Sequence, residues 1–134
     1  VPRKWMPSRA ELAHVDVAFL SEEDLMGQTG LLNRLRDEVP LVVCTAGARG
    51  ATLYMASSQL DVASYPTAAR DPTGAGDAFD AGFMYGLLAG AELRTAMLTG
   101  SAIASVIIED TGTRALGLVS GQLSERMARI SALS

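Results

Sequence analysis

The stretch that decides the fold reads DPTGAGDAFDAGF and occupies residues 71–83. Gly74 and Gly76 allow backbone conformations that other residues avoid, and they let a ligand approach the main chain closely. A helix is predicted to follow directly, over 77–89. The first amides of a helix have no partner within it and lie at the positive end of its dipole, so the loop is predicted to bind an anion such as phosphate.

An acidic residue at such a loop is unusual. Asp77 would repel a phosphate unless it faces a second reactant, such as a hydroxyl group that must lose its proton. Amides that stabilise a transferring group, beside a carboxylate that accepts a proton, suit phosphoryl transfer. The alternative for a bare G-x-G-D pattern is an ordinary helix start preceded by a glycine turn. The loop matches neither the Walker A pattern nor the dinucleotide-binding fingerprint.

Downstream of this loop the sequence predicts only helices. Glycines recur every fourth residue along the first of them, at 82, 86 and 90, which favours a buried helix packed close to a neighbouring backbone. The second, over 93–110, is apolar nearly all round and needs cover on several sides. The last is predicted over 124–133, with Leu123, Met127 and Ile130 on one face.

Upstream of the loop, strands are predicted where apolar runs are short and bounded by polar residues. Runs 15–20 and 41–46 are both of this kind, and a helix that Pro40 ends lies between them. A strand, a helix and a strand within about thirty residues indicate a crossover unit of a parallel sheet. Two further strands, 51–55 and 60–64, are predicted to pair across a turn, and a short helix at 9–14 follows a capping box.

Composition bounds the class of protein. The chain has 134 residues, 49% of them apolar and 19% charged, which is enough for one globular domain with a modest core. The net charge of -4 and the lack of a Lys/Arg cluster argue against nucleic acid as a partner. No apolar stretch is long enough to cross a membrane, and a cytoplasmic location is expected. One cysteine and one histidine exclude a disulfide framework and a Cys- or His-based metal site.

Residues 71–83 resemble, at every position, the C-terminal signature of the ribokinase-like (PfkB) carbohydrate kinases. The segments LVVCTAGARG (41–50) and DVAFLSEED (16–24) are similar to other segments of that family, in the same order. The resemblance implies an α/β fold, namely the C-terminal part of a three-layer ribokinase-like fold with a mainly parallel sheet flanked by helices. It also implies ATP-dependent phosphorylation of a hydroxyl on a sugar, a small polyol or a nucleoside.

The resemblance assigns roles to individual residues. Asp77 would be the general base that activates the acceptor hydroxyl. The amides of Gly74, Ala75 and Gly76 would form the anion hole for the γ-phosphate. Gly47 and Gly50 would border the nucleotide, with Arg49 near its phosphates. In many members a monovalent cation such as K⁺ sits beside the loop, where Asp71 and Thr73 match by position.

The chain departs from the family pattern at residues 21–24, which read SEED where the family often has Asn-x-x-Glu. The resemblance implies that this segment helps to organise Mg²⁺. Asp24 is the positional match with a shorter side chain, and Glu23 is one residue away with a longer reach. The alternative is a helix start that Ser21 caps, with acids at the positive end of the dipole.

The resemblance covers only a C-terminal portion. We therefore expect residues 1–134 to be the nucleotide-binding and catalytic-base part of one ribokinase-like domain, without its N-terminal sugar-binding half and lid. Such a part is expected to be marginally stable and inactive alone, and a homodimer is a prediction for the full-length form. The alternative to a kinase is an inactive fragment or a free-standing nucleotide- or anion-binding module. The sequence does not identify the acceptor.

Overall fold

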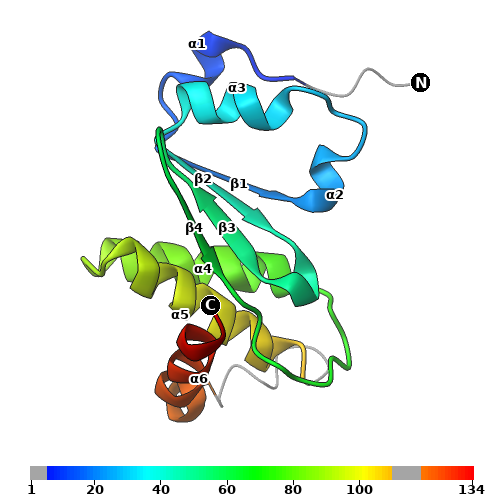
Figure 1. Ribbon diagram of the computed structural model, residues 1–134, viewed down its shortest axis with the longest axis vertical. Helices are drawn as coiled ribbons and strands as arrows, with labels where there is room; N and C mark the ends of the chain where they lie inside the picture. Colours follow the sequence, from blue (N-terminus) through cyan, green and yellow to red (C-terminus); the bar gives the residue numbers. More distant parts are fainter. Residues whose placement is uncertain (1–5, 110–118) are drawn as a thin grey trace. The chain divides into compact units, whose positions relative to one another are not determined.

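The computed structural model describes residues 6–109 and 119–134. The chain divides into two compact units: Val1–Thr45 with Thr52–Leu60, and Ala46–Ala51 with Asp61–Ser134. We call them the first and the second unit. The elements follow the chain in this order (Figure 1): α1 (Arg9–Leu12), β1 (Val17–Ser21), α2 (Glu22–Leu25), α3 (Leu31–Glu38), β2 (Leu41–Thr45), the 3₁₀ helix η1 (Gly47–Arg49), β3 (Ala51–Tyr54), β4 (Gln59–Val62), α4 (Ala75–Leu88), α5 (Leu93–Ile107) and α6 (Val119–Leu133).

The first unit contains the predicted crossover. β1 and β2 pair in parallel, with Val17 opposite Leu41 and Ser21 opposite Thr45, and α2 and α3 lie between them in the chain. α3 packs against β2 and against α1. The apolar faces of these elements form one core cluster whose buried members are Leu12, Leu20, Leu31, Leu35, Val39, Val42 and Cys44. The strand–helix–strand prediction is confirmed.

The sheet has four strands in the order β1-β2-β3-β4. β3 and β4 are neighbours, and a tight turn joins them, in which the amide of Met55 donates to the carbonyl of Ser58 at 2.9 Å. Two adjacent strands joined by so short a turn run antiparallel, since a parallel connection needs a dozen or more residues. The predicted pairing of 51–55 with 60–64 is therefore confirmed. Each strand is one residue shorter than predicted, and β4 begins one residue earlier.

The second unit contains the three long helices. α4 packs along α5, and α5 packs against α6. The glycine spacing explains the first contact, because a β-carbon at Gly82 would lie 2.9 Å from Gly100 Cα and one at Gly86 would lie 2.9 Å from Ala96 Cα. Both distances are below van der Waals contact, so the two backbones approach as closely as glycine allows. The prediction of a helix packed on a neighbouring backbone is confirmed.

The boundaries of the three long helices differ from the predicted ones. α4 begins at Ala75 because Gly74, at φ 81°, is its N-cap. α5 ends at Ile107, and the last residue predicted for it, Asp110, lies outside the described residues. α6 begins five residues earlier than predicted, at Val119.

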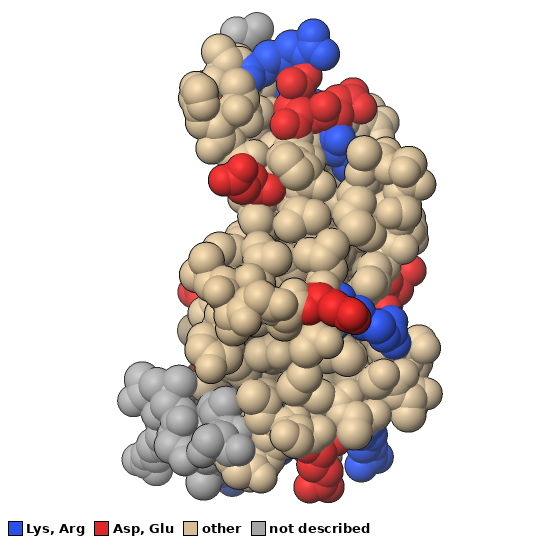
Figure 2. All heavy atoms as spheres, turned by 90° about the vertical axis from the view of Figure 1, so that its left-hand side faces the viewer, with Lys and Arg blue, Asp and Glu red and all other residues tan. Residues whose placement is uncertain are grey.

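Two surface properties bear on function. Among residues 6–109 and 119–134, no helix has the length and apolar character to cross a membrane. Figure 2 shows one face, on which acidic and basic side chains lie next to one another and form no basic cluster.

Candidate functional site

The Gly-rich loop belongs to the second unit and enters α4 through a tight turn. The amide of Ala75 donates to the carbonyl of Pro72 at 3.1 Å. Gly74 lies between them with φ 81° and ψ 1°. These dihedrals fit the third position of a type II turn, which requires a positive φ and so favours glycine. The loop therefore needs glycine at 74 for its own geometry, whatever it binds.

The start of α4 offers free amides to open space. The amides of Gly76 and Asp77 are among the first four of the helix and have no partner within it, whereas that of Ala78 donates to Gly74 O at 2.9 Å. A β-carbon at Gly74 or at Gly76 would meet no atom within 4 Å. The space beside both α-carbons is therefore open, which is compatible with an anion close to this helix N-terminus.

One of the three predicted anion-hole amides is already in use. The amide of Ala75 closes the turn onto Pro72, so it cannot also point at an anion while the turn keeps this geometry. In this conformation the helical hydrogen-bond donors of the loop are therefore the backbone amides of Gly76 and Asp77.

The predicted base, Asp77, lies in the first turn of α4 and is exposed. Asp80 follows one turn later and is half-buried. Burial, and secondarily the charge of Asp77, raises the pKa of Asp80 to about 6. The sequence motifs assigned Asp80 no role, although two acids three residues apart on a helix are neighbours on its surface. That spacing was the signal for a coupled pair.

Asp71 and Thr73, the residues predicted beside a monovalent cation, form a local turn. Thr73 donates its amide to Asp71 Oδ1 at 2.9 Å. Hydrogen bonds from the side chain and the backbone of Thr73 lower the pKa of Asp71, so its carboxyl group stays ionised. The start of the loop is also anchored, because the amides of Arg70 and Asp71 donate to the carbonyl of Ile108 at 2.8 and 3.2 Å.

The segment predicted to border the nucleotide, 47–50, also lies in the second unit. Gly47 has φ 55°, is exposed, and would place a β-carbon in open space. Gly50 has φ 99° and is buried, and its β-carbon would lie 2.0 Å from the carbonyl oxygen of Val62. The close approach of β4 therefore requires glycine at position 50, and no bound ligand is needed to account for this residue. Arg49 ends the 3₁₀ turn and is exposed.

The acidic segment predicted to organise Mg²⁺ lies in the first unit. Ser21 and Asp24 form a complete capping box: the amide and hydroxyl of Ser21 donate to Asp24 Oδ2 at 2.7 and 2.9 Å. The helix cap therefore uses one carboxylate oxygen of Asp24, Oδ2. Glu23 is exposed in the same turn.

These carboxylates suit Mg²⁺ by chemistry, because this ion is usually held by one or two carboxylates together with substrate phosphates. Within the described residues no three His, Cys, Asp or Glu side chains gather as a ready-made metal site.

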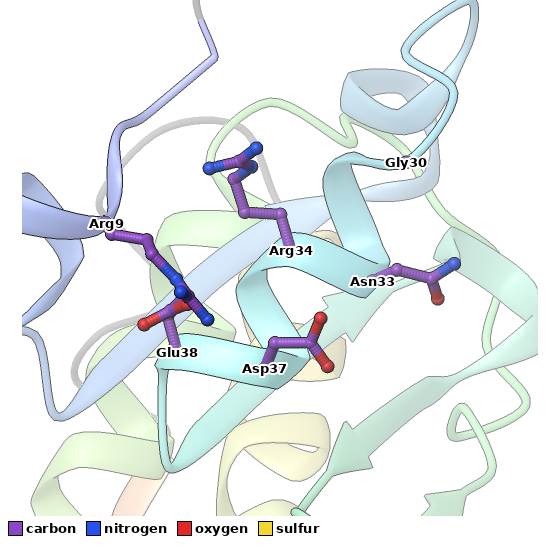
Figure 3. A pocket seen from close by; sticks show the side chains of 6 residues that line it. All are labelled: Arg9, Gly30, Asn33, Arg34, Asp37 and Glu38. Atoms are coloured by element: carbon purple, nitrogen blue, oxygen red, sulfur yellow. The ribbon is translucent and has the colours of Figure 1, made fainter.

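An open pocket of about 450 Å³ lies elsewhere in the first unit. Figure 3 shows the Arg9 and Glu38 side chains pointing toward one another across it, as an ion pair, with Arg34 and Asp37 nearby on α3. Charges of both signs line the pocket, and it contains none of the predicted site residues.

Comparison with known proteins identifies the family. The model of the pfkB family carbohydrate kinases matches residues 2–118. The chain belongs to this family. It is 43% identical over 84 residues to a nucleoside kinase of Methanothermobacter thermautotrophicus, covering 62% of this chain and 27% of that protein. It is 39% identical over 71 residues to an inositol 3-kinase of Zea mays, covering 53% of this chain and 19% of that protein.

Solved structures agree with the fold. A protein of E. coli assigned as a ribokinase II, in complex with ATP and Mg²⁺, superposes with a TM-score of 0.75 at 25% identity, covering 90% of this chain and 42% of that one. The ribokinase-like α/β fold predicted from the signature is thereby confirmed. The chain spans between about a fifth and two-fifths of the length of these three proteins.

Proposed function

We propose that the protein carrying this chain transfers the γ-phosphate of ATP to a hydroxyl group of a sugar, a polyol or a nucleoside. The observation that carries the proposal is the start of α4, where a glycine turn presents free amides to open space and an exposed carboxylate, Asp77, stands in the same helical turn. Membership of the pfkB family, and relatives that are nucleoside and inositol kinases, support the same reaction class.

In the proposed reaction Asp77 accepts the proton of the acceptor hydroxyl as its oxygen attacks the γ-phosphorus. The bond from that phosphorus to the bridging oxygen breaks, and ADP leaves with the electron pair. The amides of Gly76 and Asp77, together with that of Gly74 as the sequence predicts, stabilise the charge on the transferring group. The type II turn holds these donors before the reaction, so no reorganisation is needed when charge develops.

The remaining predicted residues contribute to binding. Gly47 and Arg49 border the nucleotide, and Asp71 with Thr73 holds a monovalent cation beside the loop. Asp24 and Glu23 hold Mg²⁺, which supplies charge neutralisation on the phosphates. The capping box leaves Oδ1 of Asp24 for that role.

The proposal is tested by incubating the whole protein that carries this chain with ATP labelled at the γ-phosphate and a panel of nucleosides, pentoses, hexoses and inositols. We expect label in one acceptor class, with ADP formed in equal amount. ATP that binds but is transferred to no acceptor would contradict the proposal. It would favour the nucleotide-binding module instead.

A further inference from the structure

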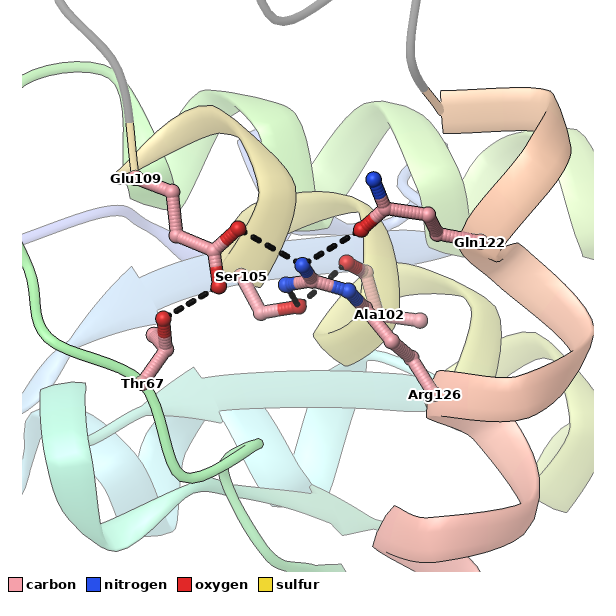
Figure 4. Close-up of polar contacts among 6 residues, drawn as sticks. All are labelled: Thr67, Ala102, Ser105, Glu109, Gln122 and Arg126. Carbon is pink, nitrogen blue, oxygen red and sulfur yellow. Dashed lines mark hydrogen bonds and ion pairs between the residues drawn. The ribbon is translucent and has the colours of Figure 1, made fainter.

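A buried arginine of α6 forms the centre of a polar cluster in the second unit. Arg126 is only 6% exposed. Its guanidinium donates to Ser105 Oγ at 2.9 Å, to Gln122 Oε1 at 2.6 Å and to Glu109 Oε2 at 2.6 Å (Figure 4). It also lies 4.5 Å from the ring centre of Tyr65. Burying a charged side chain is costly unless the charge is paired and hydrogen-bonded. The contacts of the Arg126 guanidinium meet this requirement.

Glu109 is the shared member of the cluster. Its second oxygen, Oε1, accepts a hydrogen bond from the hydroxyl of Thr67. The hydrogen bond from Arg126 is the main cause that lowers the pKa of Glu109, so this carboxylate stays ionised. Glu109 therefore links α6 to the segment that precedes the Gly-rich loop (Figure 4).

The residue before Glu109 makes a second link to the same segment. The carbonyl of Ile108 accepts from the amides of Arg70 and Asp71. Segment 67–71 is thus tied at both its ends to the C-terminal end of α5. Pro72 and the type II turn follow at once, and the turn leads into α4. The position of the α5 end therefore sets where the loop begins.

We propose that Arg126 is a positioning residue for the Gly-rich loop: by fixing Glu109 at the end of α5, it fixes the backbone of 70–71 from which the loop starts. The consequence for catalysis rests on the proposed function. A misplacement of about 1 Å costs on the order of 10²-fold in rate, so loss of Arg126 should lower kcat more than it weakens nucleotide binding.

A merely structural role makes a different prediction. If Arg126 only fastens α6 to α5, its loss lowers the stability of the second unit but leaves the loop and the turnover of the folded protein unchanged. Arg129 is a matched control, since it lies on the same helix and 5.4 Å from the same Tyr65 ring. It is exposed and lies outside the hydrogen-bonded set of Figure 4.

The test uses Arg126→Met, Thr67→Val and Arg129→Met in the whole protein. Thr67→Val removes the hydroxyl at the far end of the Glu109 link with little change of shape, and it keeps the test decisive if Arg126→Met fails to fold. Two readouts are taken on folded protein: hydrogen exchange of the amides of 70 and 71, and kcat with the KM for ATP.

We expect faster exchange at 70 and 71 in Arg126→Met, roughly a 10- to 100-fold lower kcat, and a KM for ATP within about threefold of wild type. Thr67→Val should shift both readouts in the same direction by less, and Arg129→Met should leave them unchanged. Unchanged exchange at 70 and 71 in either linking variant, or an equal effect of Arg129→Met, would overturn the proposal. If the wild type transfers no phosphate, the proposed function fails, and exchange alone decides the positioning role.

Discussion

Replacing Gly82 by alanine tests the helix packing on which α4, and with it the loop, depends. Alanine is about 1 kcal/mol better than glycine inside a helix, so the substitution would stabilise an exposed helix. At Gly82 the added carbon would lie 2.9 Å from Gly100 Cα and 3.0 Å from Ile103 Cδ1. Carbon atoms pack best at about 3.5–4.0 Å, so the two backbones must move apart by roughly 0.6 Å or more.

Overpacking of a tight core costs about 1–3 kcal/mol. The cost lies toward the upper part of this range because the nearest atom belongs to the backbone of α5, and Gly86 makes a second close approach on Ala96 one turn later. After the gain in helix propensity is subtracted, we expect Gly82→Ala to lower the free energy of unfolding by about 1–2 kcal/mol.

Gly121→Ala is the matched control. Gly121 is an exposed residue of α6, and a β-carbon there would meet no atom within 4 Å. The same substitution should therefore raise the free energy of unfolding by about 0.5–1 kcal/mol. Urea denaturation of both variants in the whole protein measures the difference. A Gly82→Ala protein as stable as the Gly121→Ala protein would refute the close contact of α4 with α5.

Three further predictions concern the site. Asp80→Asn should stabilise the protein at pH 8 but not at pH 4, because the native pKa of about 6 makes the free energy of unfolding fall as the pH rises from about 4 to 6. The full effect would be ~3 kcal/mol, which the half-exposure of Asp80 reduces to about 1–1.5 kcal/mol, and urea denaturation at both pH values measures it; equal stabilisation at both would argue against the raised pKa. Gly76→Val should weaken ATP binding and slow turnover, because a β-branched side chain would fill the space above the loop; unchanged ATP affinity in calorimetry would exclude the anion-hole role. Asp24→Ala or Glu23→Ala should raise the Mg²⁺ concentration needed for half-maximal activity several-fold, whereas a lower melting temperature alone would leave only the helix cap.

The sequence was most informative where local chemistry decides the structure. Gly74 and Gly76 predicted a turn that opens a helix, and α4 begins at Ala75. The glycine spacing at 82 and 86 predicted a close backbone contact, which α5 provides. Both features depend on residues a few positions apart in the chain, so the sequence alone is enough to predict them.

Contacts between distant segments were not predictable in the same way. The hydrogen bond between Thr67 and Glu109, and those from the amides of Arg70 and Asp71 to the carbonyl of Ile108, join residues about forty apart in the chain, and no local pattern indicates them. The partners of Arg126 come from α5, from Glu109 just beyond its end, from Tyr65 and from Gln122 of its own helix. One signal was present: Arg126 lies four residues before Ile130, and so on the apolar face predicted for α6, where an arginine must be paired.

The central claim is that Asp77 removes the acceptor's proton while the loop amides hold the phosphate. Asp77→Asn in the whole protein separates these two roles, and Asp37→Asn, at an exposed position of α3, is the control for a lost surface charge. The measurement is kcat beside the Kd for ATP in both variants. We predict that Asp77→Asn lowers kcat by about 10²- to 10⁴-fold with the Kd for ATP within about threefold of wild type, and that Asp37→Asn changes neither. A near-normal kcat in Asp77→Asn would contradict the account.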